Sequence, residues 1–367
     1  NVLTVGAIRN QDYTIASFSS RGPVDDGRLK PEICAGGWSV TSTLPGNTYG
    51  AANGTSMAAP AVTGALALMY QRYRQLNGGN DPKSGLMKAI ICNTAEDMGN
   101  AGPDFTYGFG MMNARKAVDV IDSGRYFIGQ LSSGQNTQYT INIPAGTSRL
   151  KVMLYWHDKE APLLASQALV NDLDLKVITP SAAQILPLVL NASPASVNNP
   201  AVQGADHLNN IEQVVVANPS AGTYTIDVSA YAIPLGSQEF FVTYEFLPAS
   251  LTLEYPTGGQ TFVPGEQETI RWTAIGAGGN TYKVEYSVNN GNNWSLLSST
   301  VPATQRYYNW TIPSTVSDSV LVRVTENVTL VSSTSQTRST IIGQPVVTAT
   351  NLCEGYVQLK WSAIAGA

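Results

Sequence analysis

The chain is poor in charged residues, in cysteine and in histidine, and it has no long apolar run. Charged residues make up 13% of its 367 positions, and the formal net charge is −5. Because a nucleic-acid interface needs a basic surface, this balance excludes nucleic acid as a partner. No apolar stretch reaches the length of a transmembrane segment. The three cysteines, Cys34, Cys92 and Cys353, match neither a metal-binding spacing nor a disulfide framework, so we expect buried or free thiols.

Glycine and proline, in contrast, are abundant, with 33 and 20 residues. Together with the low charge, they favour a β-rich, loop-rich extracellular protein over a helical cytosolic one. The length is sufficient for roughly two to four domains. The first residue is Asn rather than Met. We therefore expect that an N-terminal part of the protein, with any secretion signal, is missing from this chain.

Residues 49–60 place a serine at the start of an apolar helix. Two glycines and an asparagine form a tight turn, after which Thr55 and Ser56 open a helix whose body runs from Met57 to about Tyr73. The helix is rich in alanine and has almost no polar face, which predicts burial all round. Backbone N–H groups and the helix dipole favour negative charge beside Ser56. Its hydroxyl is therefore a candidate nucleophile, and a simple helix cap is the alternative.

Residues 54–60, Gly-Thr-Ser-Met-Ala-Ala-Pro, resemble the nucleophile segment of the subtilisin-like serine proteases, the subtilases. Other stretches extend the resemblance over residues 1 to about 120, namely 1–7, 17–23, 30–37, 86–95 and 107–114. The resemblance implies the C-terminal part of an α/β catalytic domain with a parallel sheet. It also implies that Ser56 forms an acyl-enzyme with protein or peptide substrates. We expect the parent protein to be secreted or exposed at the cell surface, in a bacterium.

The remaining catalytic groups of a subtilase are not found in the sequence. The family uses an Asp, a His and an oxyanion-hole Asn, all placed before the serine. No histidine precedes Ser56, and Asp12, Asp25 and Asp26 lie in apparent loops without the motif of the catalytic Asp. The missing N-terminal part of the catalytic domain is expected to supply all three groups. This chain alone is therefore expected to be inactive.

Beyond residue 125 the pattern changes to short alternating strands with turn residues between them, which predicts an all-β fold. We expect four parts: residues 1–124, the partial catalytic domain; 125–248, a jelly-roll domain; 249–343, an immunoglobulin-like sandwich; and 344–367, the start of a truncated fibronectin type III-like domain. The β parts resemble modules found in subtilases and in bacterial surface proteins. Inside the third part, Ile270 and Trp272 are expected to point inward, and Asn290-Gly291 predicts a type I′ hairpin turn.

The second part contains the candidate metal ligands. In residues 169–177, Leu173, Leu175 and Val177 share one strand face and the acids point to the other. Such jelly-roll domains can bind calcium, which needs several converging oxygens. The candidate ligands are Asp158, Asp172, Asp174 and Asp206. The alternative is that these are solvated acids at strand ends and turns, because no EF-hand loop is present.

Two other classes of function compete with the protease. The G-x-S-x-G elbow of α/β-hydrolases places its acid and histidine after the serine, which would give a role to His157 or His207. That fold continues with βα units, whereas this sequence turns all-β, so both histidines are interpreted as surface or strand-end residues. The second alternative is a non-catalytic adhesion or binding protein that retains a protease remnant.

Overall fold

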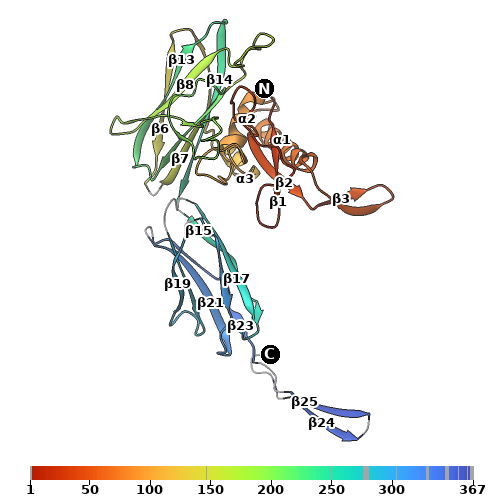
Figure 1. Cartoon of the computed structure of the whole chain (residues 1–367). Coiled ribbons are helices and arrows are strands. Elements are labelled where there is room, and N and C mark those ends of the chain that lie inside the picture. The colour runs from red at the N-terminus through yellow and green to blue at the C-terminus, as the bar shows by residue number, and fades with distance from the viewer. Residues whose placement is uncertain are drawn as a thin grey trace. The chain divides into compact units, whose positions relative to one another are not determined.

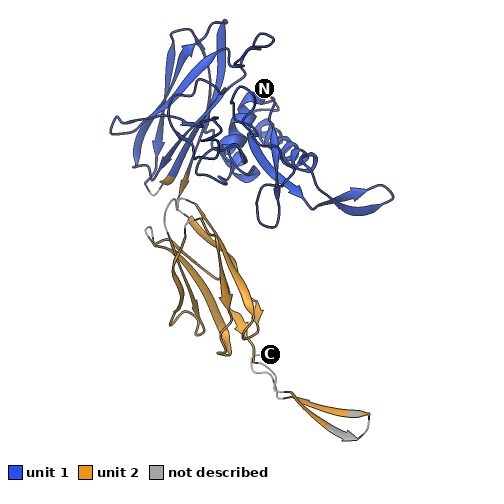
Figure 2. Cartoon of the chain, viewed as in Figure 1, with its two compact units in different colours: residues 1–145, 149–246 blue, residues 146–148, 247–367 orange. Residues whose placement is uncertain are grey.

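The computed structural model describes residues 2–145, 147–248, 250–275, 281–302, 304–327, 330–343, 347–353, 355–361 and 363. The chain divides into two compact units, coloured separately in Figure 2. One comprises residues 1–145 and 149–246, and the other comprises residues 146–148 and 247–367. Within the described residues, no helix combines the length and the apolar character needed to span a bilayer. Each unit is considered below by itself.

The sequence predicts strands at 2–8 and 30–35 and helices at 55–74, 83–94 and 113–122. The α/β segment that begins the first unit agrees with these to within a few residues, and it also contains an antiparallel hairpin that was not expected (Figure 1). Strand β1 (Val5–Arg9) pairs in parallel with β2 (Ile33–Trp38). The other elements are the antiparallel hairpin β3 (Val40–Leu44) and β4 (Thr48–Ala52), and the helices α1 (Thr55–Leu76), α2 (Ser84–Asn93) and α3 (Ala114–Asp122). The parallel pair is the one expected of a partial α/β sheet.

Helix α1 is buried on one face only. Its buried residues recur at helical spacing and are Ala58, Val62, Ala65 and Met69. This face contacts β1, β2 and α3. Ala59, Ala61 and Ala67 are exposed, and Leu68 is 57% exposed. The expectation of burial all round is therefore wrong for the described chain, because no described element covers the second face.

Helix α2, in contrast, is buried from Gly85 to Asn93. Its apolar side chains share a core with side chains from the adjoining β sheet, including Met153, Tyr155 and Phe241. The two free thiols Cys34 and Cys92 are buried, as expected. The side chain of Cys353 lies outside the described residues.

The rest of the first unit is built from two four-stranded antiparallel sheets. The first has the order β12-β7-β14-β5, and the second has the order β6-β13-β8-β9. The strands are β5 (Tyr126–Ser132), β6 (Asn136–Ile143), β7 (Thr147–Trp156), β8 (Asp172–Ile178), β9 (Gln184–Ile185), β12 (Ile211–Ala217), β13 (Gly222–Ala232) and β14 (Ser237–Pro248), with the small pair β10 (Leu188–Val189) and β11 (Val202–Gln203). Leu173, Leu175 and Val177 on β8 are buried in the core shared by both sheets, which confirms the predicted alternation.

The second unit contains two further sheets, with orders β15-β17-β20 and β16-β23-β21-β18-β19. Its strands are β15 (Ser250–Tyr255), β16 (Thr261–Phe262), β17 (Gln267–Ile275), β18 (Tyr282–Ser287), β19 (Ser295–Val301), β20 (Tyr307–Thr311), β21 (Ser317–Glu326), β22 (Ser332–Thr334) and β23 (Ser339–Ile341). Ile270 and Trp272 are buried, as predicted. Asn290 and Gly291 have φ of 58° and 83°, the positive values that a type I′ turn requires. A final hairpin pairs β24 (Val347–Cys353) with β25 (Tyr356–Trp361).

Candidate functional site

Ser56 is the second residue of α1 and its side chain is exposed. The helix is preceded by Gly54, whose φ of 156° favours glycine. The Gly54 N–H donates to the carbonyl of Gly37, at the end of β2, over 2.8 Å. A Cβ on Gly37 would lie 2.6 Å from the Cβ of Ala7 and 2.7 Å from the carbonyl oxygen of Gly54. Only glycine allows this close approach, which fixes the position of Ser56 relative to the parallel strands.

The first turn of α1 has no side-chain cap and no acidic residue. Gly54, not Ser56, occupies the N-cap position, so the alternative in which the serine merely caps the helix is wrong. The preceding turn is held by Asn53, whose side-chain oxygen accepts the N–H of Ser39 over 2.6 Å. The hydroxyl of Ser56 therefore lies at a helix end where backbone N–H groups and the dipole favour developing negative charge.

Neither histidine reaches Ser56 in the described contacts. The ring of His157 lies edge-on to the rings of Tyr155 and Phe241, with centroids 5.3 and 6.2 Å away. Burial and the positive charge of Lys88 lower its pKa. His207 lies in the loop before β12 and contacts acids instead. No hydrogen bond or ring contact in the described part of the chain therefore joins Ser56 to a histidine.

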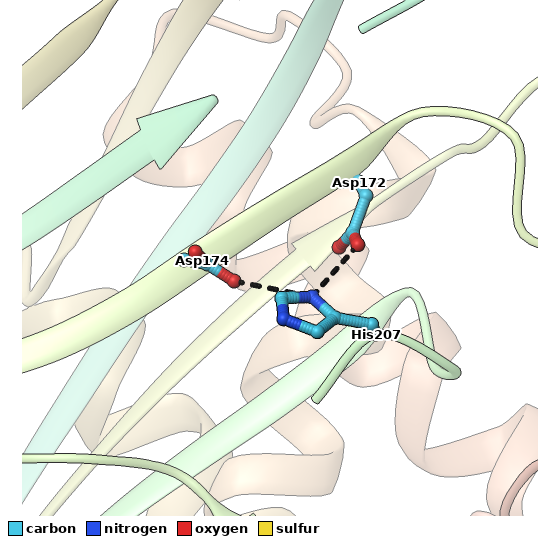
Figure 3. Close-up of side chains that lie close together, drawn as sticks. All are labelled: Asp172, Asp174 and His207. Atoms are coloured by element: carbon cyan, nitrogen blue, oxygen red, sulfur yellow. Dashed lines mark hydrogen bonds and ion pairs between the residues drawn. The ribbon is translucent and has the colours of Figure 1, made fainter. Parts of the chain in front are cut away.

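A second group of reactive side chains lies on the β sheets. Asp172 and Asp174 project from β8, and His207 approaches them from the loop before β12 (Figure 3). The His207 Nδ1 lies 2.9 Å from Asp172 Oδ2 and 3.7 Å from Asp174 Oδ1. One potential ligand atom from each of the three residues lies within 4.8 Å of the other two. The fold thus brings together two of the four predicted ligands, Asp172 and Asp174. The third residue of the group is His207, which we had interpreted as a surface or strand-end residue.

The other two predicted ligands, Asp158 and Asp206, accept hydrogen bonds from backbone N–H groups of loop residues. Asp206 Oδ1 accepts the N–H groups of Leu208 and Asn209 over 2.9 and 3.0 Å, and its Oδ2 accepts the side-chain amide of Asn209 over 2.8 Å. Asp158 accepts the N–H groups of Val170 and Asn171 over 2.6 and 2.8 Å. Both carboxylates are therefore already engaged by backbone donors.

Burial is the largest influence on the pKa of each acid in this group. Burial raises the pKa of Asp172 to about 6, although His207 opposes the shift. Burial also raises the pKa of Asp174. Glu212 on β12, which the sequence analysis did not single out, is 2% exposed. Burial, followed by repulsion from Asp206, raises its pKa well above the usual range. Only its position in the fold, beside the acids of β8, could have identified it.

The donor set does not fit the predicted calcium ion. Calcium takes six to eight oxygen ligands. Here an imidazole nitrogen, His207 Nδ1, faces the carboxylates of Asp172 and Asp174. Two of the acids expected to supply oxygens, Asp158 and Asp206, are bound to backbone N–H groups.

Comparison with known proteins identifies relatives of the α/β segment. Residues 1–110 match the model of the subtilase family, Peptidase_S8. Subtilisin DY of Bacillus licheniformis is 38% identical over 118 residues, which cover 32% of this chain and 37% of that protein. Minor extracellular protease Vpr of Bacillus subtilis (strain 168) is 37% identical over 131 residues, covering 31% of this chain and 15% of Vpr.

A longer match extends into the β sheets. The serine protease/ABC transporter B family protein tagA of Dictyostelium discoideum is 26% identical over 268 residues, which cover 63% of this chain and 15% of tagA. The chain thus spans between 15% and 37% of the length of these three relatives.

Proposed function

We propose that the chain, whose residues 1–110 match the subtilase family, is part of a secreted serine endopeptidase with Ser56 as its nucleophile. The observation that carries the proposal is the position of Ser56, exposed at the uncapped N-terminal turn of α1. Oxygen nucleophiles of acyl transfer need such a position, because charge that develops at the attacked carbonyl is stabilised by nearby N–H donors.

The chemistry is that of peptide-bond hydrolysis in two stages. The Ser56 Oγ attacks the scissile carbonyl carbon while a histidine takes its proton, and the same histidine then protonates the leaving amine. Water hydrolyses the resulting acyl-enzyme. An aspartate orients the imidazole, and an asparagine donates to the oxyanion. We assign the histidine, aspartate and asparagine to a part of the catalytic domain outside residues 1–367.

The exposed face of α1 supports this assignment. It carries small apolar residues, and a Cβ added to Gly64 would have nothing within 4 Å. A glycine in an exposed helix interior costs about 1 kcal/mol relative to alanine. Its presence is consistent with another element that approaches α1 closely. The remainder of the catalytic domain is the proposed neighbour, and it would bring the histidine to Ser56 at the same time.

The strand orders support the proposed jelly-roll and immunoglobulin-like assignments. In the first unit, β5, β6, β7 and β8 alternate between the two sheets, and β12, β13 and β14 do so again. Eight strands divided in this way into two four-stranded sheets are typical of a jelly roll. In the second unit, β17 lies between β15 and β20, and β21 lies between β18 and β23. This arrangement is consistent with an immunoglobulin-type sandwich.

Active-site labelling tests the proposed nucleophile. A fluorophosphonate should label a longer chain that includes the preceding part of the catalytic domain, and Ser56→Ala should abolish labelling. The control is Ser42→Ala, which removes another exposed serine, on β3. In subtilisin itself, loss of the nucleophile lowers turnover about a million-fold, and a similar loss is expected here.

Residues 1–367 alone should neither react nor cleave a peptide. Labelling of Ser56 in this short chain would contradict the assignment of the other catalytic groups to a missing segment. A longer chain that cleaves peptides equally well with Ser56→Ala would refute the nucleophile. A longer chain that is folded, unlabelled and inactive would favour the alternative of a binding protein with a protease remnant.

A further inference from the structure

The acidic group around β8 has more buried acceptors than donors. Three carboxylate oxygens are buried without a hydrogen-bond partner, namely Asp172 Oδ1, Asp174 Oδ1 and Glu212 Oε1. The second oxygen of Glu212 accepts the N–H of Leu175, the residue after Asp174, over 2.8 Å. Glu212 is therefore directed to the same part of β8. Unsatisfied buried carboxylate oxygens are costly, and either a proton or a bound cation relieves that cost.

His207 by itself cannot satisfy these oxygens. A protonated Nδ1 donates one hydrogen bond, and the 2.9 Å contact with Asp172 Oδ2 uses it. The distance from Nδ1 to Asp174 Oδ1 is 3.7 Å, too long for a hydrogen bond.

The imidazole of His207 is held in place by its own loop and by an aromatic ring. Asp206 binds the backbone N–H groups of Leu208 and Asn209 and so fixes the turn that follows His207. The ring stacks on Tyr231 with centroids 3.9 Å apart and an interplanar angle of 20°. A ring fixed on one face, with its Nδ1 turned toward two carboxylates, has the pre-organisation of a metal ligand.

We propose that Asp172, Asp174 and His207 form a binding site for a divalent transition-metal ion of the Zn²⁺ class, with Glu212 beside it. One nitrogen and two carboxylate oxygens are a ligand set that suits zinc and its neighbours rather than calcium. Ligands at about 2.0–2.2 Å from a tetrahedral ion lie about 3.3–3.6 Å apart. The distances from Nδ1 to the two carboxylates, 2.9 and 3.7 Å, bracket that spacing. The site does not involve Ser56 and is independent of the proposed proteolysis.

Titration of residues 1–367 with ZnCl₂ after removal of metals by a chelator tests the site directly. Calorimetry should detect one Zn²⁺ per chain, and CaCl₂ should bind more weakly. CoCl₂ should give visible absorption bands that ZnCl₂ removes. Loss of an outer-shell partner already lowers metal affinity by about 10- to 100-fold. Removal of a direct ligand by His207→Ala or Asp174→Asn should therefore lower Zn²⁺ affinity at least 100-fold.

The matched control is His157→Gln, because it removes the only other histidine in the sequence. It should leave Zn²⁺ affinity unchanged. Asp174→Asn keeps the size of a partly exposed side chain, so it also guards against misfolding of the His207 variant. Three outcomes would overturn the proposal: no Zn²⁺ binding at millimolar concentration, tighter binding of Ca²⁺ than of Zn²⁺, or Co²⁺ bands that persist in His207→Ala.

Discussion

Helices α1 and α2 belong to the same α/β segment and are both rich in small or apolar residues, yet they differ in burial. α2 is buried over nine consecutive residues, Gly85 to Asn93, whereas α1 buries one face. The glycines show the difference most clearly. A Cβ on Gly85 would lie 2.2 Å from the ring of Phe241, and a Cβ on Gly64 would meet nothing within 4 Å. Composition therefore predicts that a helix can pack closely against its neighbours. Whether a given face is buried depends on which elements lie beside it.

Glu32→Gln is expected to have the largest effect on stability. The Glu32 carboxylate is 2% exposed. It pairs with Lys88 of α2 over 2.6 Å and also contacts Lys30. Removal of one partner from a buried ion pair costs about 3–5 kcal/mol, since the other charge stays buried. Denaturant unfolding of residues 1–367 would measure the loss.

The control for this variant is Glu239→Gln. Glu239 pairs with Lys83, the residue at the N-cap of α2, and both side chains are about half exposed. An exposed pair contributes at most about 1 kcal/mol. Equal losses from the two variants would show that burial of the Glu32 pair does not govern the stability of α2.

The contribution of the Glu32–Lys88 ion pair to stability should be lost on acidification. Burial raises the pKa of Glu32, but Lys88 and Lys30 outweigh it and hold the pKa below its ordinary value of 4.5. A carboxylate with a lowered folded-state pKa stabilises the protein above the pKa of the unfolded chain. That contribution is lost as pH falls through the folded value. Thermal unfolding curves of the wild type and Glu32→Gln should therefore converge below about pH 4.5. A stability difference that stays constant with pH would contradict this origin.

Gly85→Ala should have the next largest effect on the free energy of unfolding. Phe241 is 1% exposed, so its ring cannot move aside without disturbing the core that α2 shares with the sheet. Overpacking of this kind costs about 1–3 kcal/mol, which exceeds the gain of about 1 kcal/mol in helix propensity. The change in free energy of unfolding measures it. A neutral or stabilising result would mean that α2 is less closely packed than its contacts indicate.

Gly64→Ala should have the smallest effect and the opposite sign. In residues 1–367 the added methyl group meets open space, so the gain in helix propensity should stabilise the chain by about 0.5–1 kcal/mol. In a longer chain with a complete catalytic domain, the same methyl group should meet the element that covers α1. The stabilisation should then vanish or reverse. The same gain in both chains would contradict the proposed covering of α1.

Much of the α/β segment could be predicted from the sequence because its signals are local. Turn glycines, a run of alanines and the glycine and proline after the helix define α1, so its bounds of Thr55 and Leu76 differ little from those expected. The position of Ser56 at the start of the helix follows from the same turn. The alternation of Leu173, Leu175 and Val177 likewise predicts a strand with one buried face.

The acidic cluster could be predicted only in part. Asp172 and Asp174 were candidates because their strand presents them on one face, but His207 and Glu212 come from segments more than 30 residues away. No local pattern marks them. In the sequence, Asp158 and Asp206 look equivalent to Asp172 and Asp174. In the structure, Asp158 accepts the backbone N–H of Val170, and Asp206 accepts that of Leu208.

The sequence by itself determined the helix bounds of the α/β segment to within a few residues and the position of Ser56 at a helix start, because turn residues and hydrophobic periodicity act over a few neighbouring positions. Only the tertiary structure decided which face of α1 is covered and which acids converge on His207. Burial and ligand convergence depend on contacts between strands that are distant in the chain, and these contacts come from the pairing of whole sheets.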